Sequence, residues 1–256
     1  MNNNIFLAVI ISFGILIGFQ YLYVKPHQEA LHTQRVVQQV TPKAEGASAP
    51  VVSTTQNLRA RADVLKDSPR LEIATPELTG SINLKGARLD DLLLVSYREK
   101  ADKTSPAITL LSPSGSAQPY GAFYAEFSWL ADSPSTNVPS SDTVWKADGQ
   151  KLTPDRPVRL TWDNGQSLIF ERTIAVDASA MFTITDRVIN KSGASVVLYP
   201  FGIVARQGIP QTESSAVVHE GALGVFGGTL EEYKYNSLID DKKVVKESTG
   251  GWLGIT

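Results

Sequence analysis

The side chains that could do chemistry are few in this chain of 256 residues. It contains three histidines and no cysteine, so disulfides, thiolate catalysis and cysteine-ligated metals are excluded. His27 and His32 lie in a polar stretch without strand signals, which leaves His219 as the one histidine of the folded part. A lone histidine forms neither a metal site nor a catalytic triad without partners. We therefore expect His219 to be a structural or surface residue.

The sequence contains two pairs of adjacent acidic residues, Asp90-Asp91 and Asp240-Asp241. These pairs are the candidates for a catalytic carboxylate dyad. Neighbouring residues of a strand point to opposite faces and cannot share one proton. We therefore expect both pairs at turns or sheet edges. The segment Glu231–Tyr235 mixes charged and aromatic side chains, which suits a protein contact surface, although a solvated helix start or strand edge explains it more simply.

The glycine pairs and the polar loops of the sequence do not indicate a particular ligand. Gly227-Gly228 and Gly250-Gly251 are not followed by the Lys-Ser/Thr of a phosphate-binding loop, so they predict turns. The segments Ser112–Ser116 and Asp132–Asp142 are rich in turn residues and identify no binding partner. We predict no catalytic, cofactor-binding or metal-binding residues, and the chain is not expected to be an enzyme.

The elements that would position these side chains are β-strands. Val158, Leu160 and Trp162 alternate with Arg159 and Thr161, the period of two of a half-buried strand. The hairpin residues Asp163-Asn164-Gly165 follow, because Asn and Gly tolerate positive φ. Leu168, Phe170, Ile174 and Val176 then share one face of a return strand, and Phe182, Ile184 and Val188 share one face of the next. Further strand signals cover residues 71–73, 82–84, 89–95 and 196–206.

These strands read as a meander of antiparallel neighbours. One sheet cannot cover its own apolar face, so two sheets packed face to face are the simplest solution. Residues 71–256 are predicted to form an all-β domain, a large antiparallel β-sandwich.

The N-terminus predicts a membrane anchor. Residues Ile5–Val24 carry no charge, and ~20 apolar residues match the thickness of a bilayer core. A cleaved signal peptide is the alternative. Signal peptides, however, have a shorter apolar region followed by a cleavage site with small residues, and this chain shows neither feature. We interpret residues 1–24 as one transmembrane helix in the lipid bilayer. Lys25, Arg35 and Lys43 follow the span, so charge counting by itself would place the rest in the cytoplasm.

Residues 25–70 contain no Phe, Trp or Tyr and hold seven Lys/Arg against four Asp/Glu. Such a stretch buries too little apolar area to offset its ordering entropy and is interpreted as a flexible, mildly basic linker. The whole chain has a net charge of −2. It therefore offers no electrostatic attraction to a phosphate backbone, and nucleic acid is not expected as a partner.

The order of features resembles the N-terminal part of the YidC/Oxa/Alb insertase family. The residues that carry the resemblance are MNNNIFLAVIISFGILIGFQYLY at the start, Ile82–Tyr97 (INLKGARLDDLLLVSY), Phe170–Asn190, Phe201-Gly202, and Tyr233-Lys234-Tyr235 followed by the Gly-Gly-Trp ending. Each motif is weak, but together and in this order they are specific. The resemblance extends over essentially the whole chain.

The resemblance implies a bacterial inner-membrane protein with its N-terminus in the cytoplasm and its main domain, a mutarotase-like β-supersandwich, in the periplasm. In that family insertion of nascent membrane proteins, with or without the Sec translocon, belongs to a later five-helix core. That core would lie beyond Thr256, so the chain looks truncated. The portion present would be a periplasmic scaffold that contacts the Sec translocase and its accessory proteins.

A second hypothesis is a membrane-tethered, carbohydrate- or peptide-binding β-sandwich. Trp129, Trp145 and Trp162 could stack on sugars. A mutarotase-like enzyme would need acid and base groups around the sugar ring, and the body supplies His219 as its one histidine. Trp162, on an alternating strand, is expected in the core.

Overall fold

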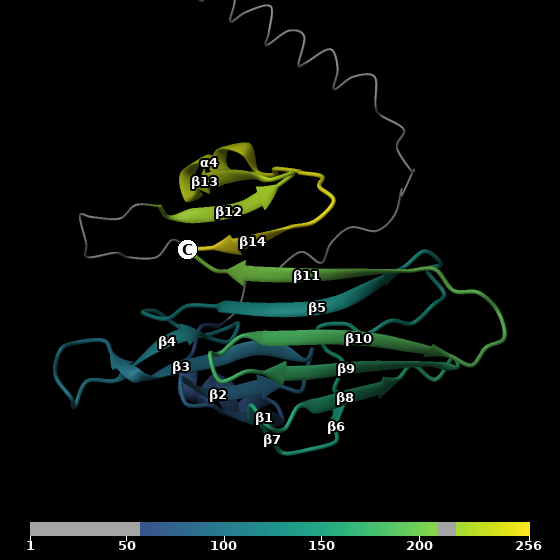
Figure 1. Cartoon of the computed structure of the whole chain (residues 1–256), viewed down its shortest axis with the longest axis horizontal. Helices are drawn as coiled ribbons and strands as arrows, with labels where there is room; N and C mark the ends of the chain where they lie inside the picture. The colour runs from purple at the N-terminus through teal and green to yellow at the C-terminus, as the bar shows by residue number, and fades with distance from the viewer. Residues whose placement is uncertain (1–56, 209–218) are drawn as a thin grey trace, which may run out of the picture. The chain divides into compact units, whose positions relative to one another are not determined.

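The fold is seen in a computed structural model that describes residues 57–208 and 219–256 (Figure 1). The largest sheet has seven strands in the order β11-β5-β3-β2-β1-β7, with β4 paired to β3. All of its pairs are antiparallel except the two-residue pairing of β1 with β7. Its strands are β1 (Arg70–Ala74), β2 (Leu78–Asn83), β3 (Arg88–Arg98), β4 (Ala107–Leu111), β5 (Phe123–Ala131), β7 (Lys151–Leu152) and β11 (Leu198–Arg206).

A second sheet of four strands has the order β10-β9-β8-β6. Its strands are β6 (Lys146–Ala147), β8 (Val158–Asp163), β9 (Leu168–Val176) and β10 (Phe182–Asn190). The predicted hairpin is confirmed: β8 and β9 pair in antiparallel register, Gly165 has φ +69°, and the Gly165 amide donates to Asp163 Oδ1 at 2.9 Å. The alternation in β9 is also confirmed, because every second residue from Leu168 to Val176 is buried.

The core lies between these two sheets. The four-stranded sheet contributes Phe170 and Ile174, and the seven-stranded sheet contributes Ile73, Ile82 and Trp129, all at most 4% exposed. The ring of Trp129 lies 5.0 Å from that of Phe170, between centroids. The structure therefore confirms an all-β sandwich built by face-to-face burial.

The strand after β10 departs from the predicted meander. β11 does not pair with β10; it pairs along its whole length with β5, from Leu198 opposite Ala131 to Arg206 opposite Phe123. The chain thus crosses from the smaller sheet to the larger one at residues 191–197. The β-branched and aromatic residues of the segment 196–206 predicted a strand correctly but could not identify its neighbour, because such a composition suits a strand in either sheet.

A third sheet was not predicted. It has three antiparallel strands in the order β13-β12-β14, namely β12 (Gly221–Phe226), β13 (Thr229–Lys234) and β14 (Gly251–Ile255). The helix α4 (Tyr235–Asp241) follows β13.

The segment before β1 contains a short helix α3 (Arg61–Val64) and a 3-10 turn η2 (Leu65–Asp67). The sequence placed residues 57–69 in the linker, whereas here the backbone of Arg59 pairs with the loop between β4 and β5: its amide donates to the Gly115 carbonyl at 2.9 Å. No helix within residues 57–208 and 219–256 is long and apolar enough to cross a membrane. The predicted span Ile5–Val24 lies outside the described residues.

Candidate functional site

The acidic pair Asp90-Asp91 lies in the middle of the larger sheet, and its predicted place at a turn or edge was wrong. Both residues belong to β3 and are buried, at 1% and 7% exposure. Ser81 on β2 pairs with Asp91 while the next residue, Ile82, pairs with Leu89, so Asp90 is the extra residue of a β-bulge. A bulge re-aims side chains relative to regular alternation. Asp90 therefore bonds to residues of β1 and β2, and Asp91 bonds to residues of β2 and of the segment before β1.

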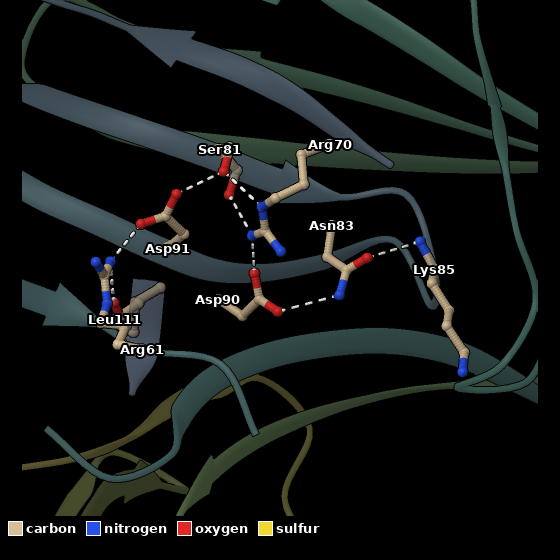
Figure 2. Close-up of polar contacts among 8 residues, drawn as sticks. All are labelled: Arg61, Arg70, Ser81, Asn83, Lys85, Asp90, Asp91 and Leu111. Atoms are coloured by element: carbon tan, nitrogen blue, oxygen red, sulfur yellow. Dashed lines mark hydrogen bonds and ion pairs between the residues drawn. The ribbon is translucent and has the colours of Figure 1, made fainter. Parts of the chain in front are cut away.

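Asp90 is held by Arg70 and Asn83 (Figure 2). Arg70 Nη2 donates to Asp90 Oδ1, and Asn83 Nδ2 donates to Asp90 Oδ2 at 3.3 Å. Burial raises the pKa of the Asp90 carboxyl above its usual value, while the Arg70 charge and these hydrogen bonds oppose the rise. Desolvation disfavours the charged form of any buried acid, and one cation beside it offsets that effect in part.

Asp91 ties the segment before β1 to the sheet. Arg61 of α3 donates from Nη2 to Asp91 Oδ1, and both side chains are largely buried, at 14% and 9% exposure. Ser81 Oγ donates to Asp91 Oδ2 at 2.5 Å and accepts from Arg70 Nε at 2.7 Å. Ser81 thereby joins the two ion pairs into one network, which Figure 2 shows as an unbroken line of contacts from Leu111 to Lys85.

Another ion pair lies nearby between β3 and β5. Arg88 Nε donates to Glu126 Oε2, with Glu126 at 6% side-chain exposure. The Arg88 guanidinium also stands 4.9 Å above the ring of Tyr124, measured to the centroid. Burial raises the pKa of the Tyr124 phenol, and the Arg88 charge opposes that rise. Each buried carboxylate of this sheet thus has an arginine partner, the arrangement in which buried charges are tolerated.

A fully buried arginine joins the two sheets. Arg172, on β9, is fully buried and donates from Nε and Nη2 to the two carboxylate oxygens of Asp186, at 2.8 and 3.0 Å. Its Nη1 donates to the Phe127 carbonyl of β5 at 2.8 Å. The guanidinium also faces the rings of Trp129 and Trp145, at 5.1 and 5.3 Å from their centroids.

The sequence analysis missed this arginine, although the signal was present. Arg172 and Asp186 occupy the inward-facing positions of β9 and β10, between apolar residues that were assigned to the core. They are also cross-strand partners in the register of the two strands. Opposite charges at matching positions on the core side of two predicted neighbouring strands indicate a cross-strand ion pair; here the Arg172 side chain is 0% exposed and that of Asp186 is 23% exposed.

The tryptophans proposed for sugar stacking are engaged inside the sandwich. Trp129 and Trp145 are 4% and 2% exposed, with ring centroids 6.3 Å apart. Trp162 is half-buried and packs on Phe170 at 5.6 Å, which confirms its expected core position. Trp129 and Trp145 are therefore too buried to offer the open aromatic face that carbohydrate sites use.

Two open hollows of about 720 Å³ each lie in the described part of the chain. One is mainly apolar and opens between the larger sheet and the turn from β9 to β10. Its lining consists of Glu77, Leu78, Leu92, Leu94, Leu110, Leu111, Phe123, Ala178, Ser179, Ala180 and Phe182. The other lies where β1 meets β6 and includes Arg70, Trp145 and Lys146 in its lining. Neither contains the histidine and carboxylate groups of an acid–base site.

The remaining candidate residues lie in or beside the third sheet, at turns and at the ends of strands and of a helix. Gly227-Gly228 forms the turn between β12 and β13, as predicted. Glu231–Tyr235 spans the end of β13 and the start of α4, which agrees with the strand-edge and helix-start interpretation. Asp240-Asp241 is exposed at the end of α4. His219 Nδ1 lies 3.9 Å from Glu232 Oε1. Gly250 directly precedes β14 and Gly251 is the first residue of that strand; both have positive φ.

The two polar loops differ in burial. Ser112 and Ser116, which bracket the turn after β4, are 2% and 1% exposed, so this loop is packed rather than solvated. The segment Asp132–Asp142 is mostly exposed between β5 and β6. His27 and His32 lie outside the described residues. Within residues 57–208 and 219–256, no group of three His, Cys, Asp or Glu side chains is arranged to hold a metal ion.

The fold and its charged clusters define a large β-sandwich domain whose buried ionic groups hold strands and sheets together. The family model of the YidC periplasmic domain matches residues 70–256. The chain therefore belongs to the YidC family, and this part of it is the periplasmic domain, which indicates an inner-membrane protein.

Full-chain comparisons agree with this assignment. The chain is 44% identical to "Membrane protein insertase YidC" of Nitrobacter hamburgensis, over 100% of this chain and 43% of that protein. It is 42% identical to the protein of the same name in Methylorubrum extorquens, over 99% of this chain and 45% of the relative. For Caulobacter sp. (strain K31) the identity is 40%, over 100% and 44%. The chain thus spans less than half the length of the curated relatives it matches.

Proposed function

We propose that this chain is the anchor, linker and periplasmic scaffold of a membrane protein insertase, and that the segments performing insertion lie in the remainder of the full protein. The observation that carries the proposal is the match of residues 70–256 to the periplasmic domain of that family. In the arrangement we infer, residues 1–24 cross the inner membrane with the N-terminus in the cytoplasm. Nascent membrane proteins would contact the part of the protein outside this chain.

The geometry supports a binding role for the body rather than a catalytic one. A general acid or base must reach a substrate with a suitable pKa, yet Asp90, Asp91 and Glu126 each bond to an arginine inside the sheet. We infer that the domain serves as a docking body for Sec-translocase accessory proteins.

The test is a deletion in the full-length protein that removes residues 57–256. The deletion begins before residue 71, where the sequence predicted the start of the domain, because the ion pair between Arg61 and Asp91 makes the preceding segment part of the folded body. The expected result is continued insertion of a Sec-independent substrate together with reduced co-purification of Sec components. In a matched control, the same residues are replaced by an unrelated folded domain of similar size. This control distinguishes the loss of specific contacts with Sec components from a change in the spacing of the remaining parts of the protein.

The proposal fails if the deletion variant, shown to be membrane-integrated and folded, loses insertion of every substrate. It also fails if Sec components co-purify at the level of the intact protein.

A further inference from the structure

The hairpin tip, defined as residues 95–106 at the turn from β3 to β4, combines exposed cations with exposed apolar and aromatic side chains. Tyr97 is 58% exposed and Val95 40% exposed, and Leu110 on β4 is 38% exposed. Arg98, Lys100 and Lys103 are exposed as well. Figure 1 shows this loop extending away from the strands that precede it.

The tip holds three cations and two carboxylates, all of them exposed. Within the part of the chain that the structure describes, no salt bridge involves Arg98, Lys100 or Lys103. Glu99 Oε1 accepts from the Tyr120 hydroxyl at 3.2 Å, and Asp102 accepts from the amide and hydroxyl of Thr104 at 2.9 and 2.8 Å. The tip therefore has a net charge of +1 on a chain whose net charge is −2, with its three cations outside any salt bridge and its two carboxylates hydrogen-bonded to uncharged donors.

The tip is also held in one shape by its own backbone. The Glu99 amide donates to the Pro106 carbonyl at 3.0 Å, and the Ser105 amide donates to the Asp102 carbonyl at 3.0 Å. The Lys100 amide donates to Ser105 Oγ at 3.1 Å. A fixed loop presents its side chains without the ordering cost that a disordered segment would meet on binding.

We propose that the hairpin tip contacts the head groups of anionic phospholipids at the periplasmic surface of the membrane. Long basic side chains attract anionic head groups, and a tyrosine ring suits the boundary between head groups and acyl chains. Val95 and Leu110 supply apolar area beside that ring. A convex tip with separated cations fits a fluid, charged surface better than it fits one compact anion. The inference rests on the proposed function in one respect, that the domain stands beside a bilayer.

The test exploits the absence of cysteine from the chain. An Ala101→Cys variant of the full 256-residue chain carries a fluorophore at the tip, and Asp155→Cys carries it on the exposed turn after β7 as the control position. Both proteins are reconstituted in phosphatidylcholine vesicles with and without phosphatidylglycerol, and quenching by a lipid-borne quencher is measured. Quenching at position 101, but not at 155, should rise with phosphatidylglycerol and fall at high salt.

The charge-matched variants isolate the tip. The triple variant Arg98→Gln, Lys100→Gln, Lys103→Gln should weaken the phosphatidylglycerol-dependent response about tenfold or more. Arg156→Gln, Arg159→Gln, Lys191→Gln removes three exposed cations elsewhere and should leave the response unchanged. Tyr97→Ala should weaken the response without changing its salt dependence. Circular dichroism confirms that each variant retains its strands.

Equal quenching in both lipid compositions, or an unchanged response in the tip triple variant, overturns the inference. A response confined to native membranes that contain protein also overturns it, and indicates an acidic protein partner instead. The proposed scaffold role stands or falls separately, because the deletion test measures insertion and Sec association rather than lipid contact.

Discussion

Arg172 and Asp186 face each other across two neighbouring strands, and through Arg172 this pair also bonds to the opposite sheet. Two hydrogen bonds of 2.8 and 3.0 Å join the guanidinium to the carboxylate, and a third of 2.8 Å reaches the Phe127 carbonyl. The contact therefore fixes strand register within one sheet and the position of that sheet against the other. Removing the arginine would leave the Phe127 carbonyl without this donor and the partly exposed Asp186 carboxylate without its cation.

Replacement of this arginine should destabilise the domain. Arg172→Met is expected to lower the free energy of unfolding by about 3 kcal/mol, because Asp186 loses its cation and the Phe127 carbonyl loses its donor. Urea denaturation followed by tryptophan fluorescence measures the change. Arg187→Met is the control, since Arg187 is 72% exposed and lies 3.6 Å from Glu171; it should change stability by less than about 0.5 kcal/mol. A loss below about 1 kcal/mol for Arg172→Met would contradict the assigned role.

Gly80 should not tolerate a side chain. Its φ is +153°, and an added Cβ would lie 2.0 Å from the carbonyl oxygen of Asp91 in the neighbouring strand. Gly80→Ala should therefore cost at least about 3 kcal/mol and disturb the bulge at Asp90. Gly165→Ala is the matched control, because Gly165 also has positive φ but no atom within 4 Å of the added Cβ. That substitution should cost about 1 kcal/mol, the backbone penalty by itself. Equal losses in the two variants would argue against the close approach.

The elevated pKa of Asp90 predicts a specific pH dependence. An acid whose pKa is higher in the folded than in the unfolded state binds more protons when folded, so its contribution to stability is full below the unfolded pKa and is lost as pH rises through the folded pKa. Asp90→Asn removes this dependence while keeping a similar shape beside Arg70 and Asn83. The stability difference, intact chain minus variant, should therefore decrease as pH rises from about 4 toward neutrality.

The control for this titration is Asp102→Asn. Hydrogen bonds from Thr104 lower the pKa of the exposed Asp102 carboxyl, so its contribution has the opposite sign and is lost as pH falls. Chemical denaturation at a series of pH values distinguishes the two. A stability difference for Asp90→Asn that grows with pH would reverse the assignment of burial as the dominant cause.

The Arg61–Asp91 ion pair should hold the segment before β1 in place. In Arg61→Ala, the amides of Val64 and Ala117 should exchange hydrogen at least about tenfold faster, because their bonds to Ala60 and Arg59 depend on the docking of that segment. Arg59→Ala removes the exposed pair with Asp67 and should leave the Val64 amide protected. Hydrogen exchange resolved by peptide or by residue makes the comparison. Unchanged exchange in Arg61→Ala would show that backbone contacts suffice.

The sequence by itself determined the family and part of the local structure. Alternation in β8, β9 and β10 predicted their limits closely, because burial on one face imposes period two on any strand. The turn at Asn164-Gly165 was predictable because positive φ restricts the choice of residue. The family was predictable because its motifs occur in a specific order along the chain, and this order does not depend on the fold.

Tertiary structure decided what depends on neighbours distant in sequence. The pairing of β11 with β5, the bulge that places Asp90 and Asp91 in one hydrogen-bonded network, and the meeting of Arg172 with Phe127 each depend on contacts that no local pattern encodes. The amino-acid sequence does not distinguish a charged residue that is buried from one that is exposed to solvent. Their difference is the desolvation free energy, which is set by the packing around them.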